Sequence, residues 1–168
     1  MINMKLEVFY DYTCPFCLRG HEYLIEALKQ YPQVEVEWRP CEAHPRPEKY
    51  GPHSDLCARG MYYAKEHGAD IMKYHRTLYD AIHPNRPNIE DLGVVATCLE
   101  GVVDTDDFEK KLSEGLYEQE LADNNKAVWE EHGFFAVPSL VYGDEKLGSA
   151  EGIGLTTQMI LDFLGKVV

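Results

Sequence analysis

The order of hydrophobic patterns in the first 40 residues limits the fold more than any other feature of this chain. Residues Lys5–Tyr10 (KLEVFY) are short, apolar and β-prone, as a buried strand is. A helical pattern begins at Pro15 and ends at Pro32, which cannot continue a helix. Residues Val34–Arg39 (VEVEWR) alternate strictly between apolar and polar, which predicts a second strand. This order predicts a β-α-β unit with two parallel strands and a right-handed crossover.

The rest of the chain changes character twice. Residues 53–132 show helical patterns with breaks at glycines and prolines, and they predict about five helices, one opened by Pro87-Asn88 and one by Asp104. Strand character returns at Pro138–Tyr142 (PSLVY), where the turn Gly143-Asp144 leads into a hairpin. Thr156 then caps a final helix.

The helical block therefore lies between two halves of one predicted sheet. We expect an α/β protein in which residues 1–52 and 133–168 form a single domain. Residues 53–132 form an all-helical subdomain inserted between the two halves.

Composition excludes several classes of partner. The chain has 168 residues, enough for one domain with a core, and a formal net charge of −13. This charge opposes binding to nucleic-acid phosphates and to anionic membranes, and no apolar run approaches the roughly 20 residues of a membrane helix. The N-terminal residues MINMKLEVFYDY lack a basic region followed by an apolar stretch, so we expect a cytoplasmic protein.

The stretch CPFC falls where the first strand ends and the first helix begins. Cys14 is expected near the helix N-cap, with Pro15 at the first helical position and Cys17 in the first turn. Free backbone N–H groups and the helix dipole then stabilise a thiolate at Cys14, whereas Cys17 faces inward. In a redox pair of this kind Cys14 attacks a disulfide and Cys17 resolves the mixed disulfide.

Three other interpretations of the cysteines remain open at this point. Cys41 and His44 form a CxxH pair that can complete a zinc site with CPFC. Alternatively, the CPFC pair is a structural disulfide or two inert thiols. Cys41 and Cys57 can also form a second redox pair, although five cysteines at scattered spacing make a poor disulfide framework.

The combination of CPFC with the distant segments VEVEWRPCEAHP and GFFAVPSLVYGDEKLGSAEGI resembles the DsbA-like branch of the thioredoxin superfamily, and the FrnE-type oxidoreductases in particular. The resemblance covers essentially the whole chain. It implies a thioredoxin-like fold with a central mixed sheet, and a thiol–disulfide oxidoreductase. For a cytoplasmic chain it favours a reductase or isomerase of protein disulfides, because that compartment is reducing.

The resemblance also assigns roles to individual residues. Cys14 corresponds to the nucleophile and Cys17 to the resolving cysteine, while Pro138 corresponds to a cis-proline that packs against them. Pro15 and Phe16 correspond to the variable dipeptide that tunes redox potential and recognition, and the Val137 backbone to a contact with the substrate chain. Ser139 corresponds to a position that is usually Ser or Thr.

One family feature is missing from the sequence. Val8 occupies the position six residues before the first cysteine, where related folds often carry a buried acid. Asp11 is the nearest acid to Cys14, and it is either a proton acceptor for the thiol or an exposed loop acid.

Partners and cofactors follow from this interpretation. We expect protein or small-molecule thiols and disulfides as substrates, and no cofactor beyond the redox-active pair, with glutathione or another low-molecular-weight thiol as a candidate electron donor. A second hypothesis is a glutathione-dependent enzyme similar to kappa-class transferases or 2-hydroxychromene-2-carboxylate isomerases, which share the fold but typically use a serine. A third is a zinc-binding or interaction module.

Overall fold

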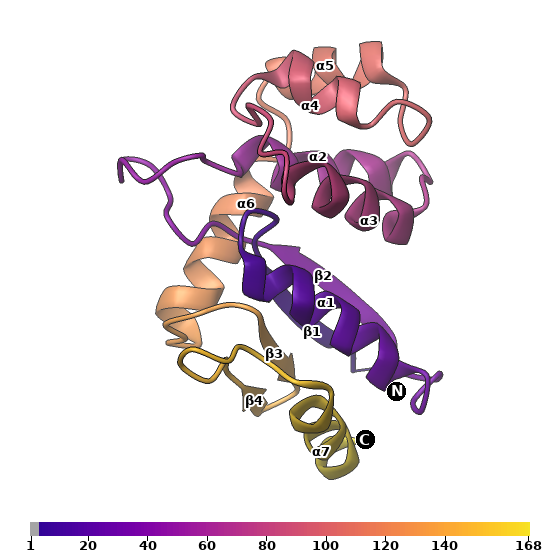
Figure 1. Ribbon diagram of the computed structural model, residues 1–168, viewed down its shortest axis with the longest axis vertical. Coiled ribbons are helices and arrows are strands. Elements are labelled where there is room, and N and C mark those ends of the chain that lie inside the picture. The colour runs from indigo at the N-terminus through magenta and orange to yellow at the C-terminus, as the bar shows by residue number, and fades with distance from the viewer. Residues whose placement is uncertain (1–3) are drawn as a thin grey trace.

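The computed structural model describes residues 4–168, so the first three residues of the predicted segment 1–52 lie outside the described range. Within that range a four-stranded sheet is flanked by helices on both faces, and further helices extend beyond one end of it (Figure 1). None of the helices in residues 4–168 combines the length and apolar character needed to cross a membrane.

The sheet is mixed, with strand order β2-β1-β3-β4. Strand β1 (Leu6–Tyr10) pairs in parallel with β2 (Val36–Pro40) and antiparallel with β3 (Ser139–Tyr142). Strand β4 (Glu145–Leu147) pairs back on β3 as the predicted hairpin. The parallel pair and the hairpin confirm the two halves of the sheet that the sequence predicts.

Strand β2 begins two residues later than the alternating pattern predicts. The Val34 N–H donates to the Tyr31 carbonyl in the turn that follows the first helix, so Val34 belongs to that turn. The register pairs Leu6, the first residue of β1, with Val36. The ladder therefore starts where β1 supplies a partner, which side-chain alternation alone does not reveal.

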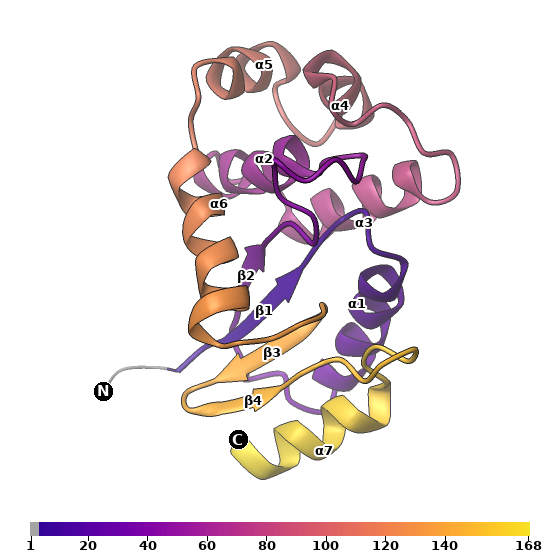
Figure 2. The same cartoon turned by 90° about the vertical axis from the view of Figure 1, so that its left-hand side faces the viewer.

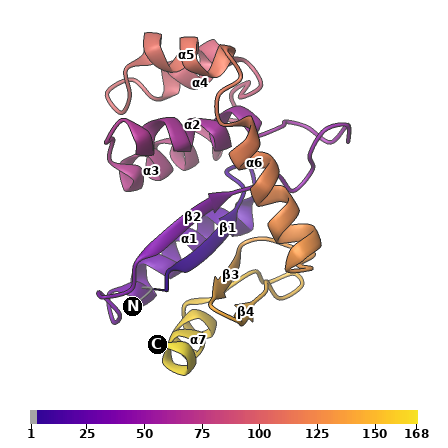
Figure 3. The same cartoon turned by 180° about the vertical axis from the view of Figure 1, so that it is seen from behind.

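Helices cover both faces of the sheet (Figures 2 and 3). On one face, α1 (Pro15–Leu28) packs beside α7 (Thr157–Val167), which is capped by Thr156 as predicted. On the other face lies a continuous helical stretch formed by α6 (Glu118–Asn125) and the π-helical segment η1 (Lys126–Glu131).

The remaining helices lie between β2 and β3 in the chain, where the sequence predicts a helical block. Figure 2 shows α2 (Asp55–Glu66) and α3 (Ile71–Ile82) next to the sheet, with α4 (Leu92–Cys98) and α5 (Thr105–Ser113) farther out.

The N-caps of two helices in this block can be compared with the helix starts that the sequence predicts. Asp104 caps α5 as predicted, by accepting a hydrogen bond from the Asp107 N–H. The predicted start of α4 at Pro87-Asn88 is wrong, because Asp91 is the N-cap and accepts from the Val94 N–H. The Asn88 carbonyl instead accepts from the Asp91 N–H in a turn that precedes the helix.

Candidate active site

The CPFC segment lies at the carboxyl end of β1 and opens α1, as predicted. Cys14 is the N-cap, with an extended backbone, and Pro15 is at the start of the helix, where its missing N–H costs no hydrogen bond. The Cys14 carbonyl accepts from the N–H groups of Cys17 and Leu18, so the first turn forms directly at the motif. The cap places the Cys14 thiol at the positive end of the helix.

The two thiols have very different surroundings. Cys14 is partly exposed, whereas the Cys17 side chain is only 1% exposed. A hydrogen bond from the Cys17 side chain lowers the pKa of Cys14, and backbone N–H groups of Cys17 and Phe16 act in the same direction against the effect of partial burial. Burial raises the pKa of Cys17 well above that of an ordinary thiol. The pair therefore consists of one accessible, acidified thiol and one buried, protonated thiol.

The peptide bond between Val137 and Pro138 is cis, and it lies beside the CPFC pair. The Cys14 thiol donates a hydrogen bond to the Val137 carbonyl at 3.8 Å, across 123 residues of sequence. The Ser139 hydroxyl donates to the Ala136 carbonyl at 2.7 Å and fixes the turn on the other side of the proline. The structure thus brings together the two most distinctive motifs of the sequence.

Helix α1 approaches Pro138 so closely that only a glycine fits at position 20. A Cβ atom at Gly20 would lie 2.6 Å from the Pro138 Cγ atom. Sequence reasoning missed this residue, because a glycine inside a helical pattern signals a close approach without naming the partner.

Asp11 is buried, at 3% exposure, so its interpretation as an exposed loop acid is wrong. One carboxylate oxygen accepts from the N–H and the hydroxyl of Thr13, and the other accepts from the Ala43 N–H at 2.9 Å. The carboxylate therefore ties the turn before α1 to the loop after β2. Its negative charge also raises the pKa of Cys14, against the stronger hydrogen-bonding effects.

The acid position of related folds is apolar here, as the sequence indicates. Val8 is buried in the core of the sheet. Glu7 points to the other face, where its carboxylate pairs with the Arg39 guanidinium at 2.6 Å. Asp11 is thus the buried acid beside the pair.

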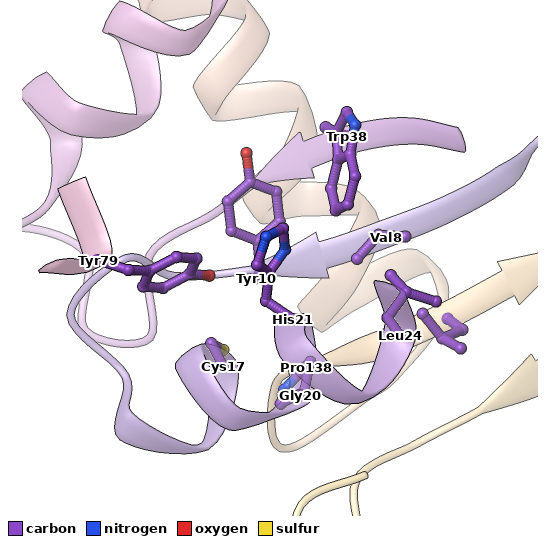
Figure 4. Close-up of a pocket in the computed structure, with 10 residues that line it drawn as sticks. Val8, Tyr10, Cys17, Gly20, His21, Leu24, Trp38, Tyr79 and Pro138 are labelled. Atoms are coloured by element: carbon purple, nitrogen blue, oxygen red, sulfur yellow. The ribbon is translucent and has the colours of Figure 1, made fainter. Parts of the chain in front are cut away.

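A small cavity of about 10 Å³, roughly the size that holds one water molecule, lies behind Cys17 between α1 and the sheet. Figure 4 shows Cys17, Gly20 and His21 of α1 around it, facing Tyr79 of α3 and the sheet. Burial lowers the pKa of His21 to about 4, so this histidine is neutral near pH 7. The surroundings of Cys17 are therefore uncharged on this side, which is consistent with a protonated thiol.

Two hollows flank Cys14 at the surface. The first, the Phe135 hollow, measures about 400 Å³ and is lined by Phe16, Phe135, Ala136, Val137, Ser149, Ala150, Glu151, Gly152 and Gly154. The second, the Arg86 groove, measures about 360 Å³ and is lined by Thr13, Cys14, Pro15, Ala43, His44, Tyr50, Gly51, Pro52, Ile82, His83, Arg86, Pro87 and Ile89. The first lies on the cis-proline side of the site, and the second on the side of the inserted helices.

Cys41 and Cys57, the cysteines of the zinc-site and second-redox-pair hypotheses, lie away from the surface. Cys41 and Cys57 are fully buried free thiols, and burial raises the pKa of both. The exposed His44 ring is engaged by the Glu48 carboxylate at 3.0 Å and stacks on Tyr50. In residues 4–168 no group of three or more His, Cys, Asp or Glu side chains is arranged to hold a metal ion.

Comparisons with known proteins agree with this geometry. Residues 5–158 match the family described as the DSBA-like thioredoxin domain. The uncharacterised protein YwbO of Bacillus subtilis is 27% identical over an alignment of 197 residues, which covers 96% of this chain and 98% of that protein.

Solved structures share the fold at lower sequence identity. The crystal structure of a probable DsbA oxidoreductase from Streptomyces coelicolor gives a TM-score of 0.76 at 18% identity, covering 98% of this chain and 90% of that one. Chlamydia trachomatis DsbA gives a TM-score of 0.73 at 15% identity, covering 97% and 85%. These likenesses confirm the predicted thioredoxin-like fold with a mixed sheet and a helical insertion. With the family match over most of its length, the chain belongs to the family of DSBA-like thioredoxin domains and has the fold of DsbA-like thiol–disulfide oxidoreductases.

Proposed function

We propose that this protein is a protein disulfide oxidoreductase in which Cys14 is the nucleophile and Cys17 the resolving thiol. The observation that carries the proposal is the inequality of the pair. Cys14 is accessible, has a lowered pKa and contacts the Val137 carbonyl, whereas Cys17 is buried and has a raised pKa. The family match supports the same chemistry.

The reduction of a substrate disulfide then follows two steps. The Cys14 thiolate attacks one substrate sulfur, a mixed disulfide forms, and the other substrate sulfur leaves as a thiolate and takes up a proton. Cys17 next loses its proton and attacks the Cys14 sulfur, which releases the second substrate thiol and leaves the Cys14–Cys17 disulfide. Burial of Cys17 opposes its deprotonation, so the second step is the one that needs help from the site.

Polypeptide substrates fit the cis-proline side of the site. The Phe135 hollow adjoins Val137, and the Phe135 ring is 86% exposed. A large exposed aromatic side chain next to a nucleophile provides apolar contact area for a substrate chain. We therefore assign protein disulfides as substrates, with the Val137 backbone and the Phe135 hollow as their contact surface.

We further propose that the enzyme works in the cytoplasm as a reductase or isomerase and belongs to the FrnE-type branch. Outside the CPFC pair, Cys41 and Cys57 are fully buried as thiols rather than joined in a disulfide, which supports a reducing compartment. The segments VEVEWRPCEAHP and GFFAVPSLVYGDEKLGSAEGI support the branch.

Reduction of insulin disulfides with dithiothreitol as the electron source tests the activity. The wild-type protein is expected to accelerate insulin precipitation, and Cys14→Ser is expected to abolish the acceleration because the attacking thiolate is gone. Cys98→Ser removes a cysteine from α4 outside the site and is the matched control, with activity expected to be unchanged. Full activity of Cys14→Ser would remove Cys14 from the mechanism.

A further inference from the structure

We propose that the Arg86 groove binds a low-molecular-weight thiol that carries a carboxylate, and that this thiol reduces the Cys14–Cys17 disulfide after each turnover. The inference rests on the proposed function and adds to it the chemical class of the electron donor and the place where that donor binds.

The groove is built from three segments that the fold brings to the nucleophile. Thr13 and Cys14 come from the turn before α1, Tyr50 comes from the loop after β2, and Arg86 follows α3. The His83 ring Nε2 lies 3.0 Å from the Tyr12 carbonyl, which fixes the segment after α3 beside the CPFC turn. A volume of about 360 Å³ falls within the range of about 300–1,000 Å³ that is typical of small-molecule sites.

The charge of the groove is opposite to that of the whole protein. The chain carries a net charge of −13, yet the groove is lined by Arg86 and two histidines and, among the described residues, by no carboxylate. The Asp11 carboxylate lies behind the groove wall, where it is buried and accepts hydrogen bonds from the lining residues Thr13 and Ala43. Two other acids are paired with cations, Glu48 with His44 and Glu90 with Arg46, each at 3.0 Å.

Arg86 is the cation of the groove that remains available. It is exposed, and no ion pair joins it to a carboxylate within residues 4–168. A guanidinium presents a fork of N–H donors that matches a carboxylate in a bidentate arrangement. A ligand bound there by its carboxylate lies in the same groove as the Cys14 sulfur.

The two hollows divide the substrates by chemistry. The Phe135 hollow is lined mainly by apolar side chains and glycines, with Glu151 as its charged residue, and it adjoins Val137, which suits a polypeptide. The Arg86 groove is walled by loops on the side of the inserted helices and carries positive charge, which suits a small anion. A thiol can thus reach Cys14 from one side without competing for the polypeptide surface on the other.

The proposed step balances as two thiol–disulfide exchanges. The donor thiolate attacks the Cys14 sulfur of the oxidised pair, a donor–Cys14 bond forms, and Cys17 leaves as a thiolate that takes up a proton. A second donor thiolate attacks the donor sulfur of this mixed disulfide and releases the Cys14 thiolate. Two donor thiols are oxidised to one donor disulfide, and the protein disulfide is reduced to the dithiol.

The reverse reaction offers a direct test with three small disulfides of different charge. Reduced protein is mixed with glutathione disulfide, which is anionic, with neutral 2-hydroxyethyl disulfide, or with cationic cystamine. The reaction is stopped by acid and alkylation, and the loss of free Cys14 is followed by mass spectrometry. The variants are Arg86→Gln, Arg86→Lys, and the matched control Arg76→Gln, which removes an exposed charge from α3 outside the groove.

Arg86→Gln is expected to slow oxidation by glutathione disulfide about fivefold, because an exposed ion pair contributes a free energy that corresponds to a change of about that size. The rate with 2-hydroxyethyl disulfide is expected to be unchanged. Arg76→Gln is expected to retain the wild-type rates. Arg86→Lys keeps the charge but loses the bidentate fork, so its rate with glutathione disulfide is expected to lie between those of Arg86→Gln and the wild type. Added salt should remove the wild-type preference for the anion. Equal slowing with all three disulfides, or the same selective loss in Arg76→Gln, would overturn the assignment of the groove. If no disulfide oxidises Cys14 in the wild type, the proposed function itself fails, which is a different result.

Discussion

At the scale of single residues, the reactivity of Cys14 results from opposing neighbours. The Cys17 side chain and the first backbone N–H groups of α1 stabilise its thiolate, and the buried carboxylate of Asp11 opposes them. Asp11 also accepts hydrogen bonds from Thr13 and Ala43, so it supports the turn that holds the motif. One acid therefore both tunes the nucleophile and fixes its position.

Replacement of this acid separates the two effects. Asp11→Asn removes the negative charge, so the pKa of Cys14 is expected to fall further. The variant also loses charged hydrogen-bond acceptors, which is expected to lower the free energy of unfolding by roughly 1–3 kcal/mol. The pH dependence of Cys14 alkylation and a urea titration measure these quantities, with Asp162→Asn on the surface of α7 as the control. A Cys14 pKa that rises in Asp11→Asn would contradict the electrostatic role.

At the scale of elements, the site depends on the contact between α1 and the loop that precedes β3. Gly20 allows the helix to approach Pro138, and the Cys14 thiol then reaches the Val137 carbonyl. Neither segment forms the site alone. The packing of these two elements converts a short cysteine motif into a redox centre.

Gly20→Ala tests this packing. The added methyl group would meet the Pro138 ring at 2.6 Å, so the helix or the loop must shift, at a cost of roughly 1–3 kcal/mol in unfolding free energy. Insulin reduction should fall together with stability. Gly165→Ala in α7, where a Cβ meets only the end of the Tyr31 side chain, is the control and is expected to be neutral or stabilising. A Gly20→Ala protein as stable and active as the wild type would show that the close contact is not required.

The sequence predicts a feature of these elements well when the contacts that produce it join residues that are close in the chain. Caps such as Asp104 and Thr156 are predictable, because the side chain bonds to a backbone N–H three residues away. The start of β2 depends on the length of its partner strand, and the role of Gly20 on a residue far along the chain. The Arg86 groove was not predicted, because it exists only when three separate segments meet.

At the scale of the whole molecule, the inserted helices are packed into the core behind the active site. His75 of α3 lies against Trp38 of β2, with ring centroids 4.4 Å apart, and against His21 of α1 at 5.3 Å. Burial lowers the pKa of His75 as it does that of His21, so both rings are neutral near pH 7. The sheet, α1 and the insertion therefore enclose Cys17 together, and the fold as a whole makes the two cysteines unequal.

The measurement that tests this inequality most directly is the trapping of the mixed disulfide. The Cys17→Ser variant is mixed with insulin whose disulfides are intact. It is expected to accumulate a covalent adduct, and proteolysis followed by mass spectrometry should map the bond to Cys14. Cys14→Ser is expected to accumulate no adduct, because Cys17 is buried and protonated. An adduct at Cys17 in Cys14→Ser, or no adduct at Cys14 in Cys17→Ser, would contradict the assignment of Cys14 as the nucleophile.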